Sequence, residues 1–355
     1  MAEAAAIEDT QALETEVLEI GDLDAEAFTE LAIQQGWSDG MPLVPPTEGS
    51  VARFVEACRG DNEPFSPISP RQVVPTMQSL AANAVMAGCK PEYFPVVLAG
   101  LRGVLNDDYN LHGTLATTHP CAPMMLVSGP LRHELSINCG SNCFGQGWRA
   151  NATIGRALSL ILMNVGGTKP AIMDRSTMGS PAKYSFCFGE NEEESPWAPY
   201  HVRRGFARED SVVTVMAAEP PHNINDHGSN SGDGILTTFA STMAQAGANT
   251  IYGGGPSIVV VGPEHAATLA RDKWTAESIR QHLYEKARVP EANVSPENRE
   301  RYAETGHVPE NGFYKIAPNA EAIHVLVAGG AGKHSTWIPS FGGTAVISVR
   351  VKQLR

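Results

Sequence analysis

The chain has 355 residues, and its 42% hydrophobic and 18% charged residues predict a folded protein with a sizeable core. Its formal net charge of -13, which no basic run offsets, excludes nucleic acids and anionic membrane surfaces as expected partners. The six cysteines are too sparse for a disulfide framework, and neither a secretory signal nor an apolar run of ~20 residues is visible. We therefore expect a cytoplasmic protein with reduced thiols and no membrane partner.

The first third of the chain is expected to be helical. Residues 1–24 are acidic and lack an apolar stripe, which indicates a flexible tail. Residues 25–110 form a mainly helical region, in which Thr47 is a typical N-cap. Helices are expected at residues 24–35, 47–58, 69–88 and 91–106.

Short β-rich runs alternate with helical patterns after residue 110. This alternation predicts an α/β fold for residues 111–355, with at least partly parallel strand pairing. Strands are expected at residues 124–128, 184–188, 212–217, 257–261, 324–328 and 344–351.

A strand, a polar bend containing Ile-Asn and Gly-Ser-Asn, and a helix occur twice, in residues 124–165 and 212–246. A further strand follows each copy, so the pattern predicts an internal strand–loop–helix–strand duplication within the α/β domain. A chance likeness between two Gly/Ser/Asn-rich loops is the alternative. Because long polar bends are costly to order and usually serve a site, we expect the two bends to share one pocket.

The second bend carries the densest polar cluster of the chain, His222-Asn-Ile-Asn-Asp-His227. His222 and His227, together with His119 before the first core strand, are expected to bind a divalent transition metal and leave one position open. Asp226 is the candidate acid–base carboxylate beside them. The alternative is a polar loop that its own Asn and Asp side chains hold in shape.

The first bend carries two thiols, Cys139 and Cys143. A thiol at the start of a helix is expected to have a lowered pKa and to be reactive as the thiolate. Cys139 is then the candidate nucleophile and Cys143 the resolving cysteine. The alternative is that both are small residues that fill a tight bend.

Both bends are also expected to bind an anion, because successive backbone amides at helix starts hold carboxylates or phosphates. Arg149, Lys333 and His334 supply positive charge. Residues 329–334 lack the spacing of a P-loop, so no nucleotide cofactor is expected. The amides belong to Gly140, Ser141 and Asn142 in the first bend and to Gly228, Ser229 and Asn230 in the second.

Three stretches, residues 36–47, 151–158 and 221–227, resemble a poorly characterised bacterial family associated with UGSC-type (seleno)proteins. The resemblance covers most of residues 36–290. It implies a redox or thiol setting, because the namesake motif places selenocysteine or cysteine shortly before another cysteine. The bend from Cys139 to Cys143 contains an extra Asn relative to that motif, so no catalytic residue is transferred.

Together these patterns predict an enzyme, a lyase or hydrolase, that acts on a small anionic molecule with the help of a metal. One alternative is a thiol-dependent oxidoreductase that uses Cys139 and Cys143. Another is a non-catalytic subunit of a redox complex, which would require a redox partner protein. The long apolar helices also lead us to expect a homo-oligomer.

Overall fold

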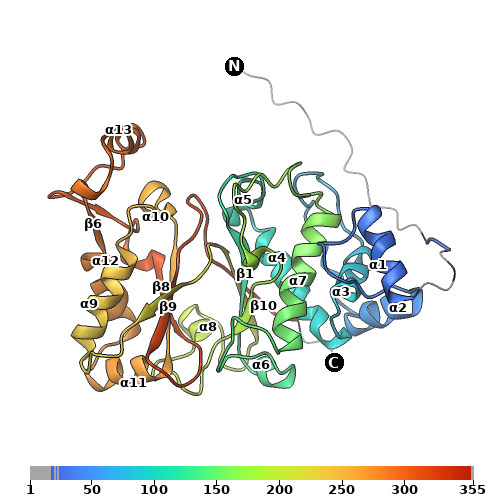
Figure 1. The fold of residues 1–355 in the computed structure, drawn as a ribbon. Coiled ribbons are helices and arrows are strands. Elements are labelled where there is room, and N and C mark those ends of the chain that lie inside the picture. Colours follow the sequence, from blue (N-terminus) through green and yellow to red (C-terminus); the bar gives the residue numbers. More distant parts are fainter. Residues whose placement is uncertain (1–16, 20, 22–23, 353–355) are drawn as a thin grey trace.

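Two four-stranded sheets lie side by side at the centre of the molecule, with helices on their outer sides (Figure 1). The computed structural model describes residues 17–19, 21 and 24–352. The expected acidic tail therefore lies mostly outside the described residues. Within the described part, the α/β class expected from the sequence is confirmed.

The first sheet has the strand order β10-β3-β1-β2, and the second has the order β4-β9-β5-β8. One parallel pair occurs in each sheet, β1 with β2 and β5 with β8, and the other neighbours are antiparallel. All six expected strands are present, but the one expected at residues 184–188 begins only at Cys187 and the one expected at 344–351 spans only Ile347–Arg350. The strands of the first sheet are β1 (Ala122–Ser128), β2 (Cys187–Gly189), β3 (Val212–Ala218) and β10 (Ile347–Arg350), and those of the second are β4 (His222–Asn225), β5 (Ser257–Val261), β8 (Ile323–Val327) and β9 (His334–Ile338).

The helices form the outer layers. The first sheet is covered by α4 and α7, with α1, α2 and α3 beyond them, and the second sheet is covered by α9, α11 and α12 (Figure 1). No helix of the described chain combines the length and the apolar character needed to cross a bilayer. The helices are α1 (Ala25–Gln34), α2 (Glu48–Ala57), α3 (Met77–Met86), α4 (Phe94–Val104), α5 (Leu111–Leu115), α6 (Leu131–Glu134), α7 (Arg149–Asn164), α8 (Tyr200–Arg203), α9 (Gly232–Met243), α10 (Asn249–Gly253), α11 (Pro263–Arg271), α12 (Ala276–Lys286) and α13 (Pro296–Glu304), and a small hairpin is formed by β6 (Arg288–Pro290) and β7 (Phe313–Lys315).

The starts of two helices in residues 25–110 are set by N-cap side chains and prolines. Thr47 caps α2 as expected, because its hydroxyl accepts the amide of Ser50 at 3.3 Å. The helix expected from residue 69 begins only at Met77, since Pro70 and Pro75 interrupt the preceding segment and Thr76 provides the cap. The helix therefore begins about two turns later than the apolar pattern predicts.

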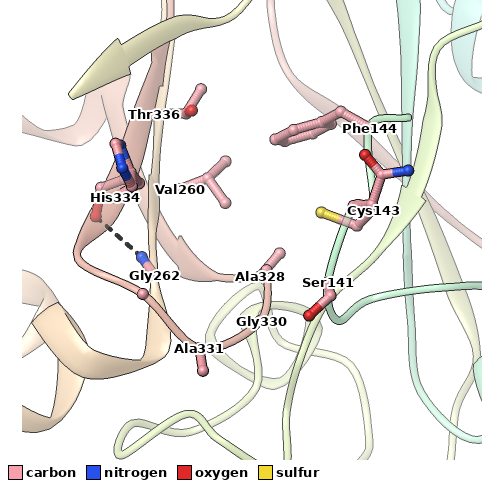
Figure 2. Close-up of a pocket in the computed structure, with 14 residues that line it drawn as sticks. Ser141, Cys143, Phe144, Val260, Gly262, Ala328, Gly330, Ala331, His334 and Thr336 are labelled. Carbon is pink, nitrogen blue, oxygen red and sulfur yellow. Dashed lines mark hydrogen bonds between the residues drawn. The ribbon is translucent and has the colours of Figure 1, made fainter. Parts of the chain in front are cut away.

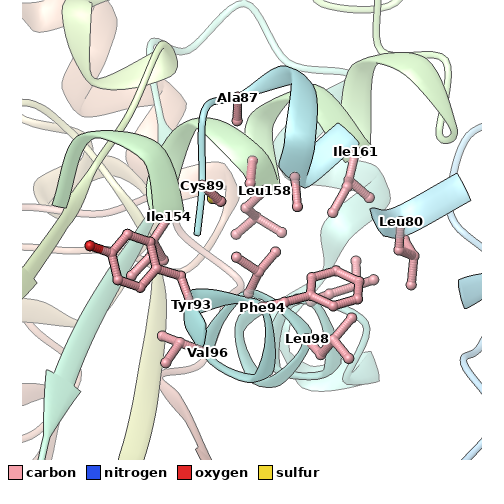
Figure 3. Close-up of a cluster of buried hydrophobic side chains, with 14 of the residues drawn as sticks. Leu80, Ala87, Cys89, Tyr93, Phe94, Val96, Leu98, Ile154, Leu158 and Ile161 are labelled. Atoms are coloured by element: carbon pink, nitrogen blue, oxygen red, sulfur yellow. The ribbon is translucent and has the colours of Figure 1, made fainter. Parts of the chain in front are cut away.

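The helical region and the first sheet share one core. Phe94 of α4 and Leu158 of α7 pack together in this cluster (Figure 3), which also contains Met125 and Val215 of the first sheet. Burial of this continuous apolar surface stabilises the N-terminal helices on the sheet. The core shows no boundary at residue 110.

A different cluster lies between the two sheets. Met124 and Leu126 of β1 point away from the helices and pack with Ile258 and Val260 of β5. Because β1 and β5 are covered on both faces, all but one of their residues are buried, and they read as unbroken apolar runs. The layers are therefore helix, sheet, sheet, helix.

The expected duplication is not confirmed in the form predicted. Its second copy begins with β3, which pairs with β1 inside the first sheet instead of opening the second. What recurs is the arrangement of strands: β1 and β2, or β5 and β8, are joined by a helical crossover and followed by an antiparallel strand, β3 or β9. The chain then crosses to the edge of the opposite sheet, as β4 or β10.

Candidate functional site

A cavity of about 310 Å³ lies between the two halves, where β5 and β8 end and β9 begins. Figure 2 shows Ser141, Cys143 and Phe144 on one side and Val260, His334 and Thr336 on the other. The loop after β8 closes the space between them. The lining residues are Ser141, Asn142, Cys143, Phe144, Val260, Gly262, Ala328, Gly329, Gly330, Ala331, Gly332, His334, Ser335 and Thr336.

The loop after β8 contacts the Cys-bearing bend directly. The amide of Gly329 donates to the carbonyl of Cys139 at 2.8 Å, and Gly330 lies so close to Ser141 that a Cβ on this glycine would overlap its hydroxyl. Glycine is therefore required for this close approach. These contacts bring the first bend and the expected positive segment at residues 329–334 to one cavity.

His334 is the imidazole of the cavity, and its orientation is fixed by neighbours. Its Nδ1 lies 3.0 Å from the side-chain oxygen of Asn223, which can only accept, so Nδ1 carries the proton. Its Nε2 lies 3.2 Å from Nε2 of His227. Lys333 donates to the carbonyl of His227 at 3.3 Å and adds a positive charge beside the pair.

The lining of the cavity carries no acidic side chain, although the protein has a net charge of -13. Within the described residues, the amides of Gly330 and Ala331 donate to no protein acceptor. The hydroxyl of Ser335 is already engaged, since it accepts from the amide of Gly262 at 2.9 Å. The site thus combines one oriented imidazole with two unoccupied backbone donors, beside the amide of Gly332, which the carboxylate of Glu264 already binds at 2.7 Å.

The two thiols do not have the lowered pKa that we expected. Burial raises the pKa of Cys143 to about 12. Burial also raises the pKa of Cys139, although the Arg132 guanidinium, 3.7 Å from its sulfur, opposes this shift. The expectation was wrong because α7 begins only at Arg149, so neither thiol lies at a helix start.

These surroundings predict which cysteine a thiol reagent reaches first. Cys139 is half-buried, whereas the other five cysteines are buried and unpaired. In the folded protein at pH 8, we expect 5,5′-dithiobis(2-nitrobenzoate) to modify Cys139 before any other thiol, and all six after unfolding. Cys139→Ser should remove the first phase and Cys143→Ser should not. Loss of that phase in Cys143→Ser would contradict the assignment.

The three expected metal ligands do not come together. Nε2 of His119 lies 2.8 Å from a carboxylate oxygen of Glu219, and the ring of His222 lies against Trp337 with centroids 5.7 Å apart. His222 opens β4 and His227 follows its far end, so about 13 Å of strand separates them. Within the described residues, none of the three belongs to a group of three or more side chains whose ligand atoms lie at metal-binding distance.

The second bend lies outside the cavity lining. The carboxylate of Asp226 accepts the amide of Ser229 at 2.8 Å and the hydroxyl of Thr238 at 2.7 Å, so it holds the bend in shape. The chain's own carboxylate thus occupies the place where an external anion was expected. Gly228 and Asn230 belong to the same bend and do not line the cavity either.

Two other residues that were expected to bind the anion instead donate hydrogen bonds within the protein. Arg149 donates to the carbonyl of Gly88 at 2.9 Å, at the end of the α3 segment. The amide of Gly140 donates to the side chain of Asn138 at 2.9 Å. Of the expected anion-binding residues, Ser141, Asn142 and His334 line the cavity, and Lys333 lies next to it.

Some residues of the site were missed because β9 was not expected. Thr336 lies two positions after His334 and therefore on the same face of that strand. Asn223, which orients His334, lies on the neighbouring strand β4. The β-branched and aromatic residues Thr336, Trp337 and Ile338 were the available signal.

Comparison of the sequence with models of known protein families and with curated proteins finds no significant match. The resemblance to the UGSC-associated family therefore stays a prediction. The site has to be interpreted from its own geometry.

Proposed function

We propose that the protein is an enzyme that acts on a small anionic molecule, by lytic or hydrolytic chemistry, in the cavity between the two sheets. The observation that carries this proposal is His334. Its ring lines the cavity, its Nδ1 proton is committed to Asn223, and its Nε2 faces a second imidazole.

The properties of the cavity support an anionic substrate. A volume of about 310 Å³ is at the lower end of ligand pockets and suits a small molecule. The absence of acidic lining residues, the amides of Gly330 and Ala331, and the ammonium group of Lys333 all favour a carboxylate or phosphate. The same features disfavour a cationic ligand.

His334 is the candidate general acid–base. With Nδ1 protonated, its Nε2 has the lone pair and receives the Nε2 proton of His227 across 3.2 Å. A substrate group that takes the place of His227 as proton donor would exchange a proton with His334 during reaction. Such proton transfer by an oriented imidazole contributes about 10²–10⁴-fold to a rate.

We do not place the expected metal ion at the pair formed by His227 and His334. Catalytic metals are usually held by three protein ligands, and no third His, Cys, Asp or Glu of the described chain lies within ligand distance of His227 and His334. The alternative of thiol chemistry has less support, because burial raises the pKa of both Cys139 and Cys143. Six unpaired cysteines fit a reducing, cytoplasmic setting, which we include in the proposal.

The test begins with binding. Titration calorimetry with inorganic phosphate, acetate, malonate and succinate is expected to show millimolar or tighter binding of at least one of them. Small carboxylic acids and phosphate esters related to the best ligand are then screened for turnover. His334→Asn should keep a polar partner for Asn223 and lower kcat by about 10²–10⁴-fold.

His222→Asn is the matched control, because His222 is exposed at the start of β4 and does not line the cavity. It should change kcat less than about twofold. Failure of every anion to bind the wild type, or equal turnover by His334→Asn and the wild type, would overturn the proposal.

A further inference from the structure

A second polar cluster, formed by Glu190, Glu192 and His201, lies next to the Cys-bearing bend. Arg132 links the two places, since its guanidinium contacts the sulfur of Cys139 and the carboxylate of Glu192. Glu190 and His201 have no exposed surface, and one ligand atom from each of the three residues lies within 4.8 Å of the others. The cluster takes no part in the proposed reaction.

The ring of His201 has one nitrogen without a hydrogen-bond partner in this cluster, among the residues that the structure describes. Its Nε2 lies 3.4 Å from the carbonyl of Arg208, which can only accept, so Nε2 carries the proton. Its Nδ1 therefore has a lone pair, is buried, and has no hydrogen-bond partner within the described chain. This atom lies 3.8 Å from Oε1 of Glu192, another electron-pair donor. Oε1 of Glu192 already accepts the Gly129 amide and lies 3.2 Å from Nε of Arg132, so the unsatisfied atom is Nδ1 of His201. A buried lone pair of this kind needs a donor or a cation.

The two carboxylates are already oriented by the backbone around them. Glu190 accepts the hydroxyl of Ser128 at 2.7 Å and the amide of Tyr200 at 2.8 Å. Glu192 accepts the amide of Gly129 at 2.6 Å. Hydrogen bonds of this kind hold metal ligands in place.

The surrounding charge also favours a cation. With Glu193, three carboxylates lie in this region, against the two guanidinium groups of Arg132 and Arg203. Acidic side chains therefore outnumber guanidinium groups by three to two in this region. A single metal ion at the centre of the cluster would reverse this imbalance.

We infer that Glu190, Glu192 and His201 bind one divalent transition-metal ion. One imidazole and two carboxylates suit Zn²⁺, Mn²⁺ or Fe²⁺, and a carboxylate can coordinate through both oxygens. Because the ligands are enclosed, the ion is structural. It would tie the segment after β2 to α8 and, through Glu192, to the turn at Gly129.

The experiment uses the full chain, stripped with a chelator and dialysed against Zn²⁺ or Co²⁺. The wild type should retain about one equivalent of metal by elemental analysis, show a Co²⁺ d–d absorption band, and melt at a higher temperature with metal than without. Glu192→Gln keeps an acceptor for the Gly129 amide but removes the charged ligand. It should weaken binding at least about tenfold and abolish the metal-dependent rise in melting temperature.

Two controls make the result specific. Glu193→Gln removes a neighbouring charge that is not a ligand, and His334→Asn disrupts the exposed imidazole pair, the main competing place for a metal. Both variants should retain about one equivalent of metal. Absence of stoichiometric binding by the wild type, loss in His334→Asn but not Glu192→Gln, or equal losses in Glu192→Gln and Glu193→Gln would each overturn the inference. Failure of this site would leave the proposed anion chemistry at His334 untouched.

Discussion

Gly262→Ala is expected to destabilise the protein by about 3 kcal/mol or more and to displace His334 from the cavity. A Cβ built on Gly262 lies 2.1 Å from the carbonyl oxygen of His334. The backbone of Gly262 is ordinary, with φ -66°, so the effect is steric and not conformational. Because the opposing atom belongs to the backbone of β9, relief requires the two strands to move apart. This movement would weaken the pairing of β5 with β9 and shift the imidazole pair.

Gly228→Ala is the matched control, since no atom lies within 4 Å of a Cβ built there and no positive φ is required. Its free energy of unfolding should stay within about 0.5 kcal/mol of the wild type. Urea denaturation measures both variants, and binding of the best anion in the calorimetric series reports the displacement of His334. Wild-type stability and anion binding in Gly262→Ala would contradict the close approach that places β9 at the cavity.

The features of the fold that depend on local chemistry were predictable. The strand at 212–218 is an apolar, β-branched run, and Thr47 is a helix cap that needs only its next few residues. Pairings between distant segments were not predictable in this way. The polar strand His222–Asn225 is a strand because it pairs with His334–Ile338, more than a hundred residues later. Nothing in its own composition distinguishes it from a loop.

Part of the candidate site was predictable, because the chemical groups of single residues can be identified from the sequence. Cys143 and His334 were selected for their chemical groups, and the fold brings both to one cavity. The roles of His119 and His222 depended on a convergence of three segments, and β4 instead separates His222 from His227. The helix expected to lower the pKa of the thiols begins at Arg149, too far along the chain to act on them.

The acidic run at residues 190–194 has the composition of a solvated face, yet Glu190 is fully buried. Charge density alone suggested solvent exposure. The better signal was position, because Glu190 follows a buried strand directly and polar groups at the carboxyl ends of strands often form sites. His201 could not be linked to it from the sequence, since a loop of irregular structure joins the two.

Acidification should reveal the imidazole of His324, which lies at the contact between the second sheet and α8. Burial lowers its pKa to about 3, and Arg204, Arg203 and Arg280 reinforce the effect. Its Nδ1 lies within hydrogen-bond distance of the Tyr200 hydroxyl, at 3.0 Å. Because the folded-state pKa lies below the unfolded value of about 6.5, protons bind preferentially to the unfolded chain. This contribution to stability is complete above pH 6.5 and is lost as the pH falls from about 6.5 toward 3.

His324→Asn isolates this contribution, because the asparagine oxygen can accept the same Tyr200 hydroxyl and does not titrate. Urea denaturation at pH 7, 6, 5 and 4 should show the wild type losing stability relative to the variant, at up to about 1.4 kcal/mol per pH unit. All other groups titrate in both proteins, so the difference between the two curves reports His324 alone. A difference that stays constant from pH 7 to pH 4 would mean that His324 is protonated as readily in the folded protein as in the unfolded chain. The hydrogen bond between Tyr200 and a neutral ring would then be the wrong description of the contact between α8 and β8.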